Sequence, residues 1–68
     1  MRLHDYLGCK WIRVNTVDGK SFEGYPVDVV YADESDSGED EITLENREWN
    51  GPQFLGIEES DIDSIQIM

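Results

Sequence analysis

Cysteine and histidine are nearly absent from this chain of 68 residues, which contains one of each. A single cysteine, Cys9, cannot form a disulfide within the chain, and an unpaired thiol suits a reducing compartment. We therefore interpret Cys9 as a small buried hydrophobic residue and expect a cytoplasmic protein. With His4 as the only imidazole, the sequence offers no Cys/His metal cluster and no His-based nucleophile pair. We predict neither a metal nor a cofactor.

Basic residues are also scarce, because five Lys and Arg stand against 16 Asp and Glu and give a formal net charge of −11. Affinity for nucleic acid rests mainly on Lys and Arg that neutralise phosphates, so this charge repels DNA, RNA and anionic lipid. The same charge attracts basic proteins and cations. A second interpretation is that the charge only keeps the protein soluble.

Long apolar runs and catalytic motifs are missing as well. No run approaches the roughly 18 residues of a membrane span, and the first residues do not lead into the apolar segment of a signal peptide. There is no Gly-rich phosphate loop and no Ser-His-Asp spacing, so we do not expect an enzyme. The length predicts one domain over residues 1–68. Such a domain buries only about 60% of the surface that its unfolded chain exposes.

The segment from Trp11 to Tyr31 carries the strongest structural signal. Two runs rich in β-branched and aromatic residues flank Asp18-Gly19, a pair typical of a two-residue hairpin. We expect a type I′ turn, with positive φ at both Asp18 and Gly19. Gly24 then indicates a bend or a close backbone approach, and Pro26 requires an outward-facing nitrogen or a bulge.

The remaining pattern predicts a small, strongly bent, five-stranded antiparallel barrel of the SH3-like type with a short N-terminal helix. The helix is expected at residues 3–7, with Leu3, Tyr6 and Leu7 on one face and Gly8 as its cap. Ile42 and Leu44 are expected to face the core, as are Ile65 and Ile67. The expected strands cover residues 10–17, 20–31, 41–46, 53–58 and 62–68, with a 3₁₀ turn at 59–61.

The stretch from residue 32 to residue 40 has a different character, because like charge is dense and no apolar residue follows Ala32. We predict a solvated, mobile loop there. A calcium loop starting at Asp33 is the alternative, but position 12, which needs a bidentate Glu, is Leu44. Trp49 either anchors a partner or folds over one end of the barrel, and we favour the second. The candidate partner surface comprises Asp33, Glu34, Asp36, Glu39, Asp40 and Trp49.

Two segments resemble the motifs of the Sm-like (LSm) family. The first is Val14 to Asp28, with Asp18-Gly19-Lys20, Phe22 and Gly24. The second runs from Phe54-Leu55-Gly56-Ile57 through Asp61-Ile62-Asp63-Ser64-Ile65. The resemblance implies a five-stranded barrel that forms rings, in which the fourth strand of one subunit pairs with the fifth strand of the next. It also implies binding of uridine- or adenine-rich RNA at the inner rim of the ring.

The two implications suit this chain unequally. Apolar edge strands need covering, and the candidate oligomer edge is Phe54, Leu55, Ile57, Ile65 and Ile67. Where the family carries an Arg-Gly pair for RNA, this chain has Glu58-Glu59-Ser60. The family's other RNA-binding loop, between the second and third strands, corresponds here to the acidic segment described above. Our leading hypothesis is therefore a non-catalytic Sm-like module that self-associates through its edges. An RNA-binding ring and an acidic protein that mimics nucleic acid are the alternatives.

Overall fold

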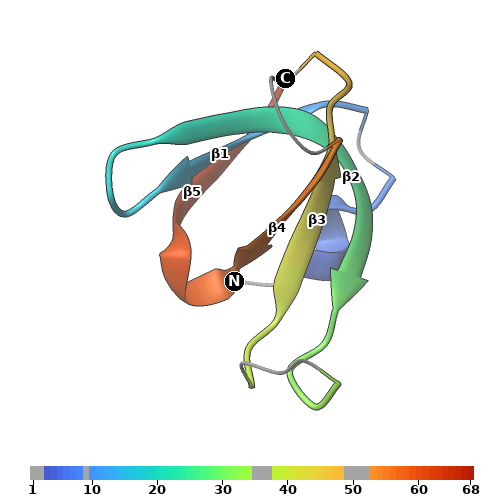
Figure 1. Cartoon of the computed structure of the whole chain (residues 1–68), viewed down its shortest axis with the longest axis vertical. Helices are drawn as coiled ribbons and strands as arrows, with labels where there is room; N and C mark the ends of the chain where they lie inside the picture. Colours follow the sequence, from blue (N-terminus) through green and yellow to red (C-terminus); the bar gives the residue numbers. More distant parts are fainter. Residues whose placement is uncertain (1–2, 9, 35–37, 49–52) are drawn as a thin grey trace.

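The computed structural model describes residues 3–8, 10–34, 38–48 and 53–68, and this part of the chain is mostly β-structure. Five antiparallel strands form one sheet in the order β4-β3-β2-β1-β5, which confirms the predicted all-β fold (Figure 1). None of the helices among these residues is long and apolar enough to cross a membrane. The elements are η1 (Leu3–Tyr6), β1 (Ile12–Thr16), β2 (Ser21–Val30), β3 (Glu41–Glu45), β4 (Phe54–Glu58), η2 (Glu59–Asp61) and β5 (Ile62–Ile67).

The β1–β2 hairpin forms where the Asp-Gly pair predicts it, but its turn is not type I′. Only Gly19 has a positive φ, of 88°, and no non-glycine residue in the described ranges shares that region, so the expected positive φ at Asp18 is wrong. The backbone N–H of Gly19 donates to Thr16 O at 3.1 Å, and the N–H of Thr16 donates to Lys20 O at 2.8 Å. This is a three-residue connection, in which a type I turn is followed by a left-handed residue.

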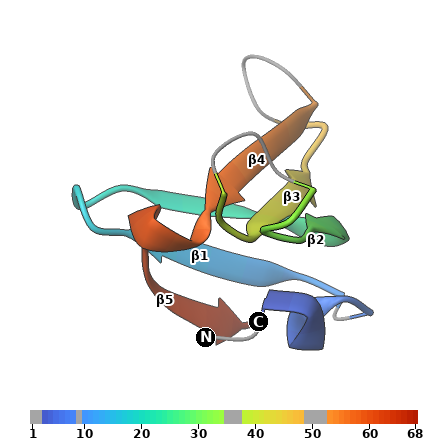
Figure 2. The ribbon, with the colours of Figure 1, turned by 90° about the horizontal axis from the view of Figure 1, so that it is seen from below.

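Strand β2 serves both halves of the sheet. Its first part, through Gly24, pairs with β1, and its second part, from Tyr25, pairs with β3. Figure 1 shows the strand curving between these two partners, and Figure 2 shows β1 and β5 lying as one layer against β3 and β4. A Cβ at Gly24 would lie 2.8 Å from Glu45 O, so the two strands approach too closely there for any larger residue. The predicted close approach is present at this bend.

A register shift lies just beyond the bend, between Pro26 and Asp28. It accommodates Pro26 at a bulge, a position that a proline in a strand tolerates. It also changes which side chains face inward. Val29 is buried, whereas Tyr25 and Val27 are exposed, so residues that regular alternation would place on one face lie on opposite faces across the bulge.

The core lies between the two layers and is made almost entirely of aliphatic side chains. Burying one such side chain completely stabilises the fold by about 1.5–3 kcal/mol. The predicted inward positions Ile42 and Leu44 are fully buried. The buried hydrophobic residues are Leu3, Ile12, Val14, Val29, Ile42, Leu44, Ile57 and Ile62.

Two expectations about the periphery need correction. The N-terminal helix is a single 3₁₀ turn, in which Leu3 is buried while Leu7, expected on the same face, is 41% exposed. A 3₁₀ helix has three residues per turn, so Leu7 does not stack above Leu3 as it does at the α-helical spacing. Ile67, expected to face the core, is 67% exposed, because it ends a strand at the border of the sheet.

Replacing Gly19 with Val tests the hairpin. A β-branched residue at a φ of 88° is strained, and we expect a loss of about 1–3 kcal/mol in the free energy of unfolding. Chemical denaturation measures it. Lys20→Val is the matched control, because it adds the same side chain next to the turn at a residue without positive φ. Equal stability of the two variants would show that the turn is placed wrongly.

Candidate interaction surfaces

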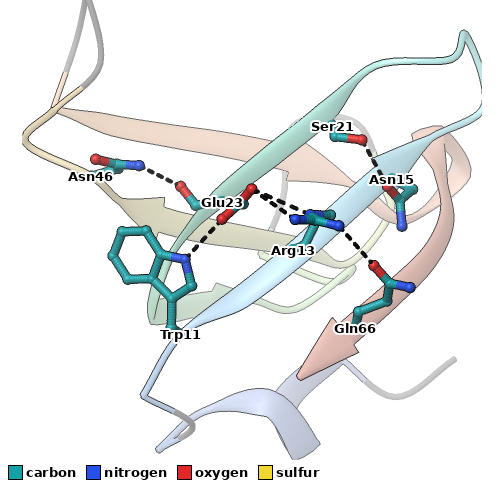
Figure 3. A network of polar contacts seen from close by, with 7 residues as sticks. All are labelled: Trp11, Arg13, Asn15, Ser21, Glu23, Asn46 and Gln66. Carbon is teal, nitrogen blue, oxygen red and sulfur yellow. Dashed lines mark hydrogen bonds and ion pairs between the residues drawn. The ribbon is translucent and has the colours of Figure 1, made fainter. Parts of the chain in front are cut away.

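The outer face of the sheet, opposite the core, carries a hydrogen-bonded network centred on Glu23 (Figure 3). Its Oε1 accepts from Trp11 Nε1 at 3.1 Å, and its Oε2 accepts from Arg13 Nε at 3.3 Å and Nη2 at 3.2 Å. These donors stabilise the carboxylate, so the hydrogen bond from Trp11, and then Arg13, lowers the pKa of Glu23. The network therefore ties β1 to the part of β2 that precedes the bend.

The same network extends to β5. Arg13 Nη1 donates to Gln66 Oε1 at 3.4 Å, Asn15 Nδ2 donates to Ser64 Oγ at 3.1 Å, and Ser21 Oγ donates to Asn15 Oδ1 at 2.7 Å (Figure 3). The outer surface of β5, β1 and the part of β2 that precedes the bend is therefore a polar layer whose side chains satisfy one another. Such a surface offers few apolar groups to a partner.

Glu23→Gln tests the centre of this network. An amide supplies one acceptor oxygen and turns two donor hydrogens toward Trp11 or Arg13, so we expect a lower thermal midpoint at pH 7. A lowered pKa means that the stabilisation is present above the ordinary value of 4.5. It is lost as the pH falls through the lowered pKa. The melting temperatures of the unaltered protein and of Glu23→Gln should thus converge as the pH is lowered. A difference between them that is the same at every pH would contradict the assignment.

The residues of the candidate oligomer edge differ in burial. Leu55 and Ile65 are half-buried and pack against the core, and Ile57 is buried. Phe54 alternates to the outer face and is 53% exposed, which excludes burial on both faces of β4 within one chain. Together with the exposed Ile67 described above, these side chains occupy the two strands that end the sheet.

A hollow of about 270 Å³ lies beside β4, between the β1–β2 hairpin and η2. Its apolar wall includes Val17, which is 64% exposed, and its rim includes Asp18. The Thr16 hydroxyl donates to the Asp18 carboxylate and lowers its pKa. The hollow is lined by Thr16, Val17, Asp18, Lys20, Phe22, Leu55, Gly56, Ile57 and Asp61.

Carboxylates gather at the end of β4. Burial raises the pKa of Glu58, and the neighbouring charges of Glu39, Asp61 and Glu41 raise it further. Glu39 is held there because its two carboxylate oxygens accept from Ser60 N at 2.9 Å and Ser60 Oγ at 3.1 Å. The turn that follows β4 is therefore electronegative.

Glu58→Gln should stabilise the fold at pH 7, since it removes a charge that this environment disfavours. A raised pKa means that the folded state binds the proton more tightly than the unfolded state. The cost of Glu58 is thus absent below the ordinary value of 4.5 and grows as the pH rises through the raised pKa. Melting temperatures at pH 7 and pH 4 measure the difference. Glu48→Gln, beyond the other end of β4, is the control, and an equal gain there would refute a local cause.

The predicted acidic partner surface is only partly assembled. Glu39 lies against η2, Asp40 Oδ1 accepts from Ala32 N at 2.8 Å, and Asp33 and Glu34 lie in an exposed turn after β2. Asp36 and Trp49 lie outside the described residues, as does Cys9. Within the described ranges, no group of three or more His, Cys, Asp or Glu is arranged to hold a metal ion.

A second hollow, of about 370 Å³, was not predicted from the sequence. It lies on the outer side of the sheet where β3 ends, and its walls include Trp11 and Tyr25, whose ring centroids are 4.8 Å apart at an interplanar angle of 86°. The hairpin register contained the signal, since a three-residue turn after Thr16 places Trp11 opposite Tyr25. Its lining residues are Trp11, Tyr25, Glu45, Asn46, Arg47 and Glu48.

No family model, curated protein or solved structure matches this chain.

Proposed function

We propose that the chain is a non-catalytic Sm-like interaction module that self-associates by pairing β4 of one copy with β5 of the next. The order of elements supports this proposal, since a short N-terminal helix, a tight first hairpin and a bent second strand are the features of the resemblance. The observation that carries it is the strand order, in which β4 and β5 occupy the two ends of the sheet.

Both end strands have reason to be covered. An edge strand presents a row of N–H and C=O groups without ladder partners. The apolar side chains on these strands add to that tendency, because Phe54 on β4 and Ile67 on β5 are 53% and 67% exposed. Pairing β4 with β5 satisfies the backbone groups and joins the half-buried Leu55 to the half-buried Ile65 of the next copy. The sheet thereby continues from one copy into the next.

RNA binding receives less support than self-association. The turn after β4, where the family carries its Arg-Gly pair, holds Glu58 and Glu59 and no basic residue, and the charges of Glu39, Glu41 and Asp61 act on Glu58 from nearby. Phosphates would be repelled there. We therefore assign the module to contacts between proteins.

Ile67→Lys tests the assembly. Ile67 is 67% exposed in the single chain, so the charge should not disturb the fold, but it should be buried and unpaired in a β4–β5 contact. A buried unpaired charge costs several kcal/mol, and we expect the mass in solution to fall from that of an oligomer to that of a monomer.

Val27→Lys is the matched control for this experiment. Val27 is 46% exposed and lies on the central strand β2, away from both sheet edges. Its mass in solution should equal that of the unaltered protein. A wild-type chain that is monomeric at all concentrations, or an oligomer that survives Ile67→Lys, would refute edge pairing.

A further inference from the structure

The hollow beside Trp11 and Tyr25 contains an aromatic pair that is held in place before any ligand arrives. The two rings meet edge to face with centroids 4.8 Å apart, and Trp11 is fixed by its hydrogen bond to Glu23 (Figure 3). Tyr25 is 48% exposed and follows the part of β2 that carries the polar network. A ligand that stacks on this pair therefore need not order it first.

The opposite wall is equally fixed. Asn46 is a buried polar residue, 7% exposed, at the point where the chain leaves β3. Its Nδ2 donates to Glu23 O at 2.7 Å, and its Oδ1 accepts from Glu48 N at 2.9 Å. The segment that carries Glu48 is thereby held against β2, next to the aromatic pair. Trp11 and Asn46, on opposite walls of the hollow, are thus both tied to Glu23, the first through its side chain and the second through its backbone oxygen.

The charged residues around the hollow determine which sign of charge its ligand should carry. Glu45 and Glu48 line it, and one basic residue, Arg47, is exposed at its rim. The whole chain carries a formal charge of −11. A cation over an aromatic face gains about 0.5–1 kcal/mol at an exposed site and 2 or more when it is desolvated. Aromatic rings and carboxylates therefore favour the same kind of ligand here.

We propose that this hollow binds an arginine side chain from a basic segment of a partner protein. The guanidinium group stacks on Tyr25, the more exposed ring of the perpendicular pair, while Glu45 and Glu48 accept its hydrogen bonds. The volume of about 370 Å³ is within the range of ligand pockets. The site lies on the outer face of the sheet, so it does not require that β4 and β5 pair between copies.

The strand register extends this site across the sheet. Tyr25 pairs with Glu45, and Glu45 pairs with Phe54. Side chains at paired positions share a face, so Phe54, 53% exposed, continues the row that begins at Trp11 and Tyr25. A basic segment that crosses the strands would place an apolar side chain against Phe54 and its arginine in the hollow.

Titration with the capped peptide Gly-Arg-Gly tests the proposal, with the Trp11 indole N–H observed by NMR. We expect a saturable shift of this resonance. The peptide with citrulline in place of arginine, which has the same shape but no charge, should bind at least about tenfold more weakly, a loss of about 1.4 kcal/mol. Equal binding of the two peptides, or no shift at accessible concentrations, would overturn the proposal.

Paired variants separate this site from general attraction to an acidic protein. Tyr25→Ala should weaken binding at least fivefold, whereas Val27→Ala, on the same strand but outside the hollow, should not. Glu48→Gln should weaken binding more than Glu34→Gln, which removes the same charge from the turn after β2. Equal losses at Glu48 and Glu34 would refute a specific site, and so would unchanged binding by Tyr25→Ala.

Arg47→Gln provides an independent check that the ligand carries a positive charge. Removing a like charge from the rim should tighten binding of the arginine peptide. Weaker binding by this variant would show that the charges of the hollow do not act on the ligand as proposed and would overturn the proposal. The mass in solution of each variant should equal that of the unaltered protein, since these residues lie off the paired edges.

Discussion

The bend of β2 at Gly24 is the constraint on which the rest of the structure depends. One strand pairs with β1 before this residue and with β3 after it, and the backbone of β3 approaches so closely that a Cβ would lie 2.8 Å from Glu45 O. A straight strand would leave both layers as one open sheet whose aliphatic inner face lies in water. Because β2 bends, Val14 and Leu44 from different layers are both fully buried.

The bend also determines what the outside of the molecule offers. Before it, the outer face is a closed polar network around Glu23, and beyond it the outer face carries the exposed Tyr25 and Val27. Bending the sheet brings its two layers together but leaves β4 and β5 as the end strands. The edges and the aromatic hollow are thus two surfaces that approach each other at Phe54 on β4, and we propose the first for another copy of the chain and the second for a cationic partner.

Local patterns predicted the elements well and their surroundings less well. The Asp-Gly pair located the hairpin, and the alternation around Ile42 and Leu44 located the core, because both depend on neighbours in sequence. The turn type was missed because Asp-Gly also occurs where a type I turn precedes a left-handed glycine. Exposure of Ile67 could not be read from alternation, which identifies a face but not whether anything covers it. The hydrogen-bonded network centred on Glu23 was not predicted, because its residues come together only through the register of neighbouring strands, which alternation within one strand does not give.

Amide hydrogen exchange followed against protein concentration tests the central claim most directly. If β4 of one copy pairs with β5 of the next, N–H groups on these two end strands should exchange more slowly as the concentration rises. The N–H groups in the β1–β2 and β2–β3 ladders should exchange at the same rate at every concentration, because their ladder partners lie within one chain. Fast exchange along β4 and β5 at every concentration would contradict the account.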